Sequence, residues 1–225
     1  GVVQGVLQAL GAERIVLRLA RNVARHTERK DGSMLHGEVP SELVPFLENG
    51  LRFFADPLAG QKTGFFLDQR DNRSRVEALA SGRTVLNVFA YSGGFSLYAA
   101  RGGATSVVSL DLSAPALADA ERHFEANAAD STIAACDHRL MCGDAFELLA
   151  ELRASGRRFD VVIIDPPSFA KNAAAVAKAL TAYRALTRLG LGVLEPGGQI
   201  VLASCSSRIG SDEFVANAEA EAHRV

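Results

Sequence analysis

The pattern of hydrophobic and polar residues differs between the two parts of this chain, and one pattern gives way to the other between residues 68 and 83. Residues 1–68 carry short alternating runs broken by Gly and Pro, which is typical of strands and turns. They predict strands over residues 6–10, 14–19, 34–39, 44–47 and 51–55. Glu48-Asn49-Gly50 predicts a hairpin turn between the last two strands, because Asn-Gly suits the left-handed backbone of a tight turn.

From residue 84 onward, strand-length apolar runs alternate with helix-length segments. Strands are predicted over residues 84–89, 106–110, 139–142, 159–164 and 199–203, and helices over residues 95–101, 114–127, 145–154, 174–194 and 211–222. Such alternation indicates βαβ units and a parallel sheet covered on both faces. The predicted fold class is α/β, a Rossmann-like domain with a mostly parallel sheet, preceded by a small β-rich domain.

These patterns also predict the division of the chain into domains. We expect a small β-rich (α+β) domain over residues 1–68 and a larger α/β domain over residues 84–225. The boundary falls at residues 69–83, where residues 71–79 predict a linking helix.

Net charge and apolar content limit the classes of partner. A formal net charge of −2 argues against a protein that coats nucleic acid through charge alone. A local basic stretch nevertheless lies between residues 14 and 30. Its cations are Arg14, Arg18, Arg21, Arg25, Arg29 and Lys30, and Glu28 is its acidic residue. This stretch fits either an RNA-binding patch or a solvated face. The apolar runs are shorter than the roughly 20 residues of a membrane span. We therefore expect a cytoplasmic protein that does not contact membranes.

Three cysteines are too few and too irregularly spaced for a disulfide framework, so we expect free thiols. Cys136, His138 and Cys142 lie close together in the sequence, but their spacing matches no common zinc pattern and a fourth ligand is missing. We assign no metal.

The first candidate site is a strand that runs into a Gly-containing turn and then a helix, over residues 86–96. Gly93 and Gly94 allow backbone to approach a ligand at the start of the helix. Asp111 ends the next predicted strand, where a carboxylate can accept both hydroxyls of a ribose. Asp144 follows the third strand, and it either receives an adenine amino group or caps the next helix.

The fourth and fifth strands end in a second set of candidate groups. Asp165-Pro166-Pro167 places an acid in a rigid loop at the carboxyl edge of the sheet, where ligands of such folds bind. Cys205 ends the next strand, in a position to attack a substrate in the same cleft. A buried structural cysteine is the commoner fate of this residue, but polar serines flank it and Arg208 favours a thiolate.

In this order, these motifs resemble those of class I S-adenosylmethionine (SAM)-dependent methyltransferases. More narrowly, the chain is similar to the bacterial 23S ribosomal RNA large-subunit methyltransferase I family, which forms 5-methylcytosine. The sequence Lys-Thr-Gly-Phe-Phe-Leu-Asp-Gln-Arg-Asp-Asn-Arg over residues 62–73 is the most specific motif, and the resemblance covers about residues 34–222.

The resemblance implies a role for each candidate residue, with SAM as cofactor and S-adenosylhomocysteine (SAH) as product. It makes Cys205 the nucleophile and Asp165 the acid that contacts the target base. It places Pro166, Pro167 and Phe169 beside the substrate, Phe169 being one of the aromatic residues that either stack on a base or belong to the core. The implied cofactor-binding residues are Phe89, Tyr91, Ser92, Gly93, Gly94, Asp111, Leu112, Asp144, Ala145, Asp165, Lys62, Thr63, Phe65, Asp68, Gln69, Arg70 and Arg73.

The chemistry of cytosine supports the two catalytic roles. Carbon 5 becomes nucleophilic only after a thiolate adds to carbon 6, which is a task for Cys205. An acid at the ring nitrogen neutralises charge as the adduct forms, which is a task for Asp165. A base must then remove the proton from carbon 5. Relatives with two catalytic cysteines place one in the Asp-Pro loop, where this chain has Ser168, so a water molecule or Asp165 is left for this step.

Three other interpretations of these motifs exist. The nearest is a guanine or adenine methyltransferase, which Cys205 and the Ser168 that follows the two prolines argue against. A non-catalytic RNA-binding protein would not need the three cofactor carboxylates, and a nicotinamide dehydrogenase would need a G-x-G-x-x-G turn. The expected partner is RNA, in particular 23S rRNA, and the sequence is compatible with a homodimer.

The family also implies an N-terminal RNA-binding module of the PUA type and a C-terminal antiparallel strand pair. This sequence opens on Gly1 and stops at Val225. We therefore expect a fragment that lacks the strand pair, with its fifth strand at an exposed edge of the sheet.

Overall fold

The computed structural model describes residues 2–39, 43–58, 60, 64–170 and 172–224. The chain divides into two compact units, residues 1–70 and residues 71–225. We call them the N-terminal unit and the sheet unit. Within the described residues, no helix combines the length and the apolar character needed to cross a bilayer.

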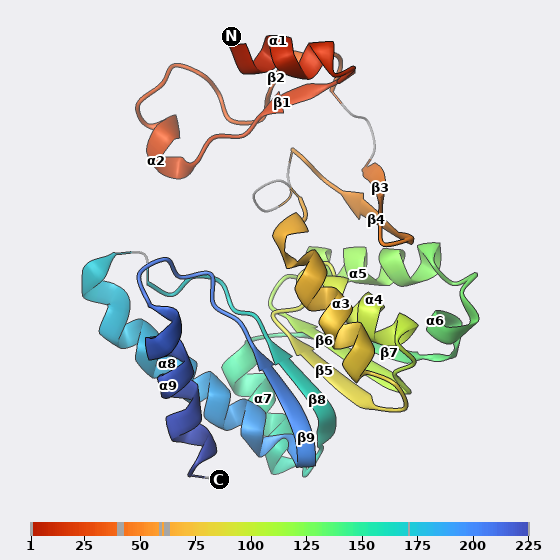
Figure 1. The fold of residues 1–225 in the computed structure, drawn as a ribbon, viewed down its shortest axis with the longest axis vertical. Helices are drawn as coiled ribbons and strands as arrows, with labels where there is room; N and C mark the ends of the chain where they lie inside the picture. Colours follow the sequence, from red (N-terminus) through yellow and green to blue (C-terminus); the bar gives the residue numbers. More distant parts are fainter. Residues whose placement is uncertain (1, 40–42, 59, 61–63, 171, 225) are drawn as a thin grey trace. The chain divides into compact units, whose positions relative to one another are not determined.

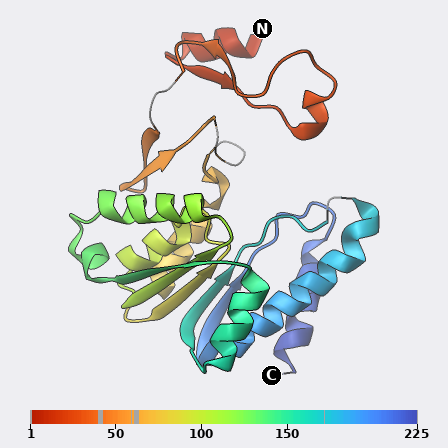
Figure 2. The same cartoon turned by 180° about the vertical axis from the view of Figure 1, so that it is seen from behind.

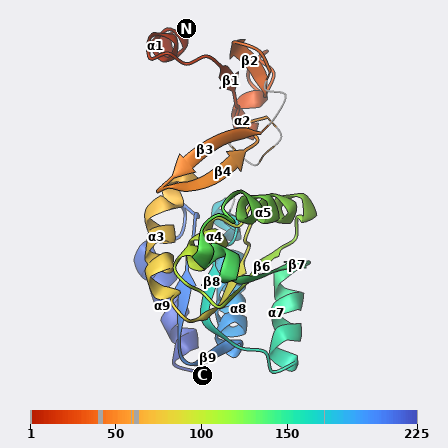
Figure 3. The ribbon, with the colours of Figure 1, turned by 90° about the vertical axis from the view of Figure 1, so that its right-hand side faces the viewer.

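The N-terminal unit contains two antiparallel strand pairs and short helices. Its elements are α1 (Val2–Ala9), β1 (Ile15–Leu17), α2 (Arg21–Ala24), β2 (Ser33–His36), β3 (Val44–Glu48), β4 (Leu51–Ala55) and the 3-10 turn η1 (Leu67–Gln69). Strand β1 pairs with β2 and β3 pairs with β4, the latter pair forming the hairpin visible in Figure 3. Asn49 and Gly50 have φ angles of 48° and 84°. The predicted Asn-Gly hairpin turn is therefore confirmed.

The prediction of a strand over residues 6–10 was wrong, because this segment lies in helix α1 and the turn after it. Its apolar residues recur every three to four positions, which is a helical period. Gln4 and Gln8, one helical turn apart, both reach strand β2: Gln4 Nε2 donates to Leu35 O at 2.7 Å and Gln8 Nε2 contacts His36 Nδ1 at 2.9 Å. These two contacts join the helix to β2.

The sheet unit is a five-stranded parallel sheet in the order β7-β6-β5-β8-β9, flanked by helices (Figure 1). This confirms the predicted Rossmann-like α/β fold. Among the described strands, β9 lies at an edge of this sheet. The elements are α3 (Arg70–Leu79), β5 (Thr84–Val88), α4 (Gly94–Arg101), β6 (Ser106–Asp111), α5 (Ala114–Ala126), α6 (Ser131–Ala135), β7 (Asp137–Cys142), α7 (Ala145–Ala154), β8 (Phe159–Ile164), η2 (Ala173–Ala175), α8 (Val176–Gly192), β9 (Leu194–Leu202) and α9 (Ser211–Ala222).

Side chains of the central strands alternate between two apolar layers, as a sheet covered on both faces requires. Leu86 and Val162 pack in the layer with α7 and α8, whereas Val85 and Val161 pack in the layer with α3 and α4. Helix α3 lies in front of the sheet in Figure 1, and α7 lies in front after the half turn to Figure 2. All four of these side chains are fully buried, so the central strands form the core of the unit.

Two features of the sheet unit differ from the prediction. Strand β9 begins at Leu194, because Leu194 pairs with Phe159 before the register shifts to Val161 opposite Gln199. Helix α6 was not predicted. The Asp130 side chain caps it by accepting from Thr132 N at 2.9 Å. A helix of five residues is too short to show a helical period in the sequence.

Candidate cofactor and active site

The loop between β5 and α4 has an unusual backbone. Phe89 and Tyr91 have positive φ angles of 61° and 50°, a conformation that costs a non-glycine residue roughly 1–2 kcal/mol. The neighbouring strand β6 holds the loop in place, because Ala90 N donates to Leu110 O at 2.9 Å and Tyr91 N donates to Asp111 Oδ2 at 2.8 Å. Strained backbone that the surroundings over-determine is characteristic of binding sites.

Helix α5 packs against the same loop. Gly93 has a φ angle of 72°, and a Cβ atom there would lie 2.6 Å from the Cβ of Ala120, so close helix packing alone requires this glycine. His123 is fully buried, and its Nδ1 lies 2.8 Å from the carbonyl oxygen of Ser92. His123 was missed in the sequence, since a single histidine within an amphipathic helix carries no signal of this contact.

Asp111 stands at the end of β6 and binds backbone with both carboxylate oxygens. Oδ2 accepts from Tyr91 N and Oδ1 accepts from Ser113 N, each at 2.8 Å. Helix α5 is instead capped by Ser113, whose Oγ accepts from Ala116 N. Asp111 is therefore an anchor of the β5–α4 loop, and each of its oxygens keeps a second lone pair for a ligand.

Asp144 caps helix α7, one of the two roles left open for it. Its Oδ1 accepts from Phe146 N at 2.8 Å and from Glu147 N at 3.2 Å. The side chain is exposed, and Ala145 beside it is buried. Leu112, which follows Asp111, has 73% of its surface exposed and offers apolar surface on the same edge of the sheet.

The structure brings Cys205 to the Asp-Pro loop. Strands β8 and β9 are parallel neighbours, so the residues that follow them meet at one edge. The Cys205 thiol lies 3.9 Å from the carbonyl oxygen of Pro166 and can donate to it, and Cys205 is exposed. Asp165 is half-buried, with its backbone N 3.5 Å from Val88 O. Thiol, carboxylate and the end of β5 thus share one edge of the sheet.

Tyr183, on helix α8, connects the two loops and was also missed in the sequence. Its hydroxyl lies 2.9 Å from Ser204 Oγ, which in turn accepts from Ser206 N, so it holds the backbone on both sides of Cys205. Burial raises the pKa of the Tyr183 hydroxyl, and Cys205 and Asp165 add to that shift. Only the fold could reveal these contacts, because α8 precedes the thiol by about twenty residues.

Phe169, at the end of the Asp-Pro loop, packs edge to face on Tyr183 with ring centroids 5.2 Å apart. It is half-buried and touches the apolar cluster of Ala170, Ala179 and Ile209. Pro167, before it, is exposed. Phe169 therefore serves the core in this structure, while Pro167 presents the loop to solvent.

The specific motif over residues 62–73 is distributed over different environments. Lys62 and Thr63 lie outside the described residues. Phe65 is buried in the N-terminal unit, its ring centroid 4.9 Å from Phe46 and 4.8 Å from Phe53. Asp68 and Gln69 form η1, and Arg70 begins α3.

Arg73, the last residue of this motif, is buried on α3. Its guanidinium lies over the Tyr98 ring, 5.9 Å from the centroid. A packing contact within the sheet unit therefore accounts for part of this motif.

The group of Cys136, His138 and Cys142, at the end of α6 and on β7, has a structural explanation. The His138 ring stacks on Phe124 at 3.7 Å, and His138 Nε2 lies 2.8 Å from Ser109 Oγ. Burial raises the pKa of Cys136 to about 11, and the Cys142 thiol contacts Leu112 O at 3.6 Å. Across the described part of the chain, no three metal-binding side chains gather around a common point.

Comparisons with known proteins agree with this architecture. The family model described as S-adenosylmethionine-dependent methyltransferase matches residues 15–225. A ribosomal RNA large subunit methyltransferase of Deinococcus radiodurans is 50% identical over 203 residues, which cover 89% of this chain and 49% of the relative. Ribosomal RNA large subunit methyltransferase I of Aeromonas salmonicida is 41% identical over 194 residues, covering 85% of this chain and 48% of the relative.

The chain spans about half the length of these curated relatives. Among solved structures, a methyltransferase crystallised in complex with SAH superposes with a TM-score of 0.81 at 31% identity, covering 98% of this chain and 55% of that one. The chain therefore belongs to the family of SAM-dependent methyltransferases.

Proposed function

We propose that this chain transfers a methyl group from SAM to carbon 5 of a cytosine in large-subunit ribosomal RNA, by way of a covalent adduct with Cys205. The observation that carries the proposal is the Cys205 thiol beside the Asp165-Pro166-Pro167 loop. The names of the relatives from Deinococcus radiodurans and Aeromonas salmonicida support ribosomal RNA as the substrate.

The residues at the ends of β5, β6 and β7 fit SAM. Asp111 uses one lone pair of each oxygen for backbone, so the remaining lone pairs suit the two ribose hydroxyls. Asp144 is exposed with both capping bonds on Oδ1, which leaves Oδ2 to accept from an adenine amino group. Leu112 adds apolar surface for the adenine ring. When bound, SAM supplies an electrophilic methyl group.

The reaction on the base begins at Cys205. Its thiolate forms a bond to carbon 6 of cytosine, and the electron pair of the 5,6 double bond moves toward carbon 5 and the ring nitrogen. Asp165 donates a hydrogen bond or a proton at that nitrogen, which offsets the developing negative charge. Carbon 5 then accepts the methyl group.

Release of the product needs loss of the carbon 5 proton, cleavage of one bond, and return of any proton that the ring nitrogen has taken from Asp165. A base removes the proton from carbon 5, the 5,6 double bond re-forms, and the bond between carbon 6 and the Cys205 sulfur breaks. We assign the base to Asp165 or to a water molecule beside it. The Tyr183 hydroxyl stays protonated, in line with its raised pKa, and supports the loop that carries Cys205 through its hydrogen bond with Ser204.

The test measures methyl transfer from labelled SAM to a 23S rRNA transcript, followed by nucleoside analysis. We expect 5-methylcytosine with the wild-type chain and with Cys142→Ala, an exposed cysteine at the end of β7 that serves as the control. Cys205→Ala should abolish transfer and leave SAH affinity unchanged, because the thiol acts only on the base.

A second arm looks for the adduct itself. RNA with fluorine at carbon 5 of cytosine should trap a covalent complex with the wild-type chain, since no base can remove fluorine as it removes a proton. The trapped complex should be absent with Cys205→Ala. Full transfer by Cys205→Ala, or methylation of guanine or adenine, would overturn the adduct mechanism while leaving the cofactor assignment intact.

A further inference from the structure

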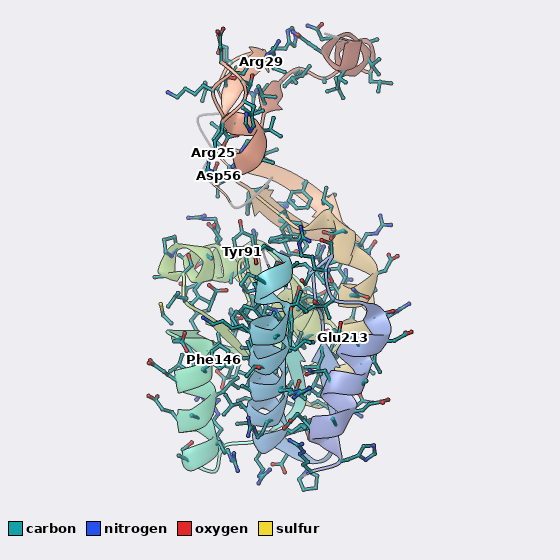
Figure 4. The ribbon with its side chains drawn as sticks, turned by 90° about the vertical axis from the view of Figure 1, so that its left-hand side faces the viewer. Arg25, Arg29, Asp56, Tyr91, Phe146 and Glu213 are labelled. Carbon is teal, nitrogen blue, oxygen red and sulfur yellow. The ribbon has the colours of Figure 1, made fainter. Side chains whose placement is uncertain are left out.

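The loop that joins β1 to β2, residues 18–32, gathers cations on the surface of the N-terminal unit. Arg25, Arg29 and Lys30 are exposed there, and Figure 4 labels Arg25 and Arg29 on this loop. Within the described residues, none of these three cations has an ion-pair partner. The whole chain has a net charge of −2, so this concentration of positive charge is a local feature.

An ion pair and two hydrogen bonds join the two ends of the loop. Asp31 lies 3.3 Å from Arg18 Nε and accepts from Leu19 N at 2.6 Å, and Gly32 N donates to Leu17 O at 2.8 Å. The hydrogen bond from Leu19 and the charge of Arg18 lower the pKa of Asp31. Asp31 is exposed, but it pairs with Arg18 and so offsets the charge of that arginine.

Arg18 differs from the other cations of the loop. Its guanidinium donates to the carbonyl oxygens of Pro57 and Gly60, and its side chain is 23% exposed. Arg18 therefore fixes the loop to the rest of the N-terminal unit. The structure separates one structural arginine from three cations that remain available to a partner.

We propose that the β1–β2 loop binds the phosphate backbone of single-stranded RNA through Arg25, Arg29 and Lys30. This inference rests on the proposed function, which requires a polyanionic substrate. A protein with net negative charge repels RNA at long range and needs a local basic surface to bind it. A base also leaves its stack most cheaply in unpaired RNA, so the bound strand is expected to be single-stranded.

The test uses the triple variant Arg25→Gln, Arg29→Gln, Lys30→Gln. The control carries the same change of net charge at the amino end of the sheet and on α8, with Arg153→Gln, Arg158→Gln and Arg188→Gln. The probe is a fluorescein-labelled 20-nucleotide single-stranded RNA of mixed sequence, followed by anisotropy from 50 to 300 mM KCl. SAH titration checks that each variant keeps its cofactor affinity.

Each lost phosphate contact should reduce the slope of log Kd against log salt by about 0.7. The triple variant should therefore lose about 2 from the slope and bind roughly 100-fold more weakly near 0.1 M KCl, whereas the control should lose far less. Equal slopes for the two variants would overturn the role of the loop and leave the proposed function standing.

Two further results would also decide the question. A wild-type chain that binds SAH but no RNA at 50 mM KCl would overturn both the loop assignment and RNA as the substrate. Binding to vesicles containing phosphatidylserine that exceeds binding to RNA, and that the triple variant loses, would assign the loop to a lipid surface instead.

Discussion

Asp111→Asn isolates the double role that we assign to Asp111. The carboxylate accepts backbone N–H groups from Tyr91 and from Ser113, both at 2.8 Å. The amide keeps the shape of the side chain but turns one acceptor into a donor that faces an N–H group. A hydrogen bond to a charged group contributes about 1.5–3 kcal/mol, so we expect a loss of roughly 2–3 kcal/mol in the free energy of unfolding.

For a chain of this size, that loss corresponds to a fall in Tm of about 5–10 °C. The same substitution should weaken SAH binding by about 1–3 kcal/mol, or roughly 5-fold to 150-fold in Kd, because the ribose hydroxyls lose a charged acceptor. Calorimetry measures both quantities on the same preparation. Asp144→Asn is the matched control for stability alone, since Asn caps helices about as well as Asp and Tm should hold.

The two measurements separate the two roles of Asp111. A lower Tm with an unchanged Kd would confine Asp111 to support of the β5–α4 loop and remove it from the cofactor site. An unchanged Tm and an unchanged Kd would refute the reasoning altogether.

Three further predictions concern packing and titration. Gly93→Ala should lower the free energy of unfolding, measured by urea titration, by about 2–5 kcal/mol, because backbone strain adds to the clash with α5. Gly82 also has a positive φ angle, of 70°, but nothing lies within 4 Å of its added Cβ. The control Gly82→Ala should therefore lower the free energy of unfolding by only about 1–2 kcal/mol. Tyr183→Phe should lower kcat several-fold while SAH affinity holds, because it releases Ser204; an unchanged kcat would leave Tyr183 with a packing role only. Burial lowers the pKa of His138 from 6.5 to about 4. Between these values the unfolded chain binds the proton and the folded chain does not, so stability should fall by about 3 kcal/mol as pH drops from 6.5 to 4. His138→Gln should remove this part of the pH dependence of Tm.

The sequence predicted the sheet unit well because its signals are local. Continuous apolar strands such as residues 161–164 can lie only in the middle of a covered sheet, and the alternation of strand and helix then predicts parallel pairing. The hairpin turn at Asn49-Gly50 was also predicted, because these two residues alone favour it. The strand predicted over residues 6–10 was wrong, because a short segment with apolar residues at both spacings fits a strand or a helix, and only the contacts of Gln4 and Gln8 with β2 distinguish the two.

The candidate site could be predicted only in part, for a physical reason. Residues that follow strands are placed at the carboxyl edge by the fold class itself, so the sequence alone predicted that Asp165 and Cys205 lie at one edge; their roles stay predictions. His123 and Tyr183 act through contacts with segments 21 to 31 residues away. Their side chains are buried on helices, where an aromatic or a histidine looks like any other core residue. Only packing distinguishes them.

The strand order supports the place at which the proposed cofactor and substrate sites meet. In the order β7-β6-β5-β8-β9, the first three strands along the chain are added toward one edge of the sheet and the last two toward the other edge. The boundary lies between β5 and β8, and ligands of open α/β sheets bind at such a switch point. Asp111 and Asp144 follow strands on one side of it, and Asp165 and Cys205 follow strands on the other. Neighbouring strands lie about 4.8 Å apart, so the proposed reaction places a methyl donor over β5 close to a base over β8. The strained turn at Phe89 and Tyr91 stands at the end of β5, on this boundary. Under the proposed function, the anchoring of this turn by Asp111 links the geometry of the cofactor site to the position from which the methyl group leaves.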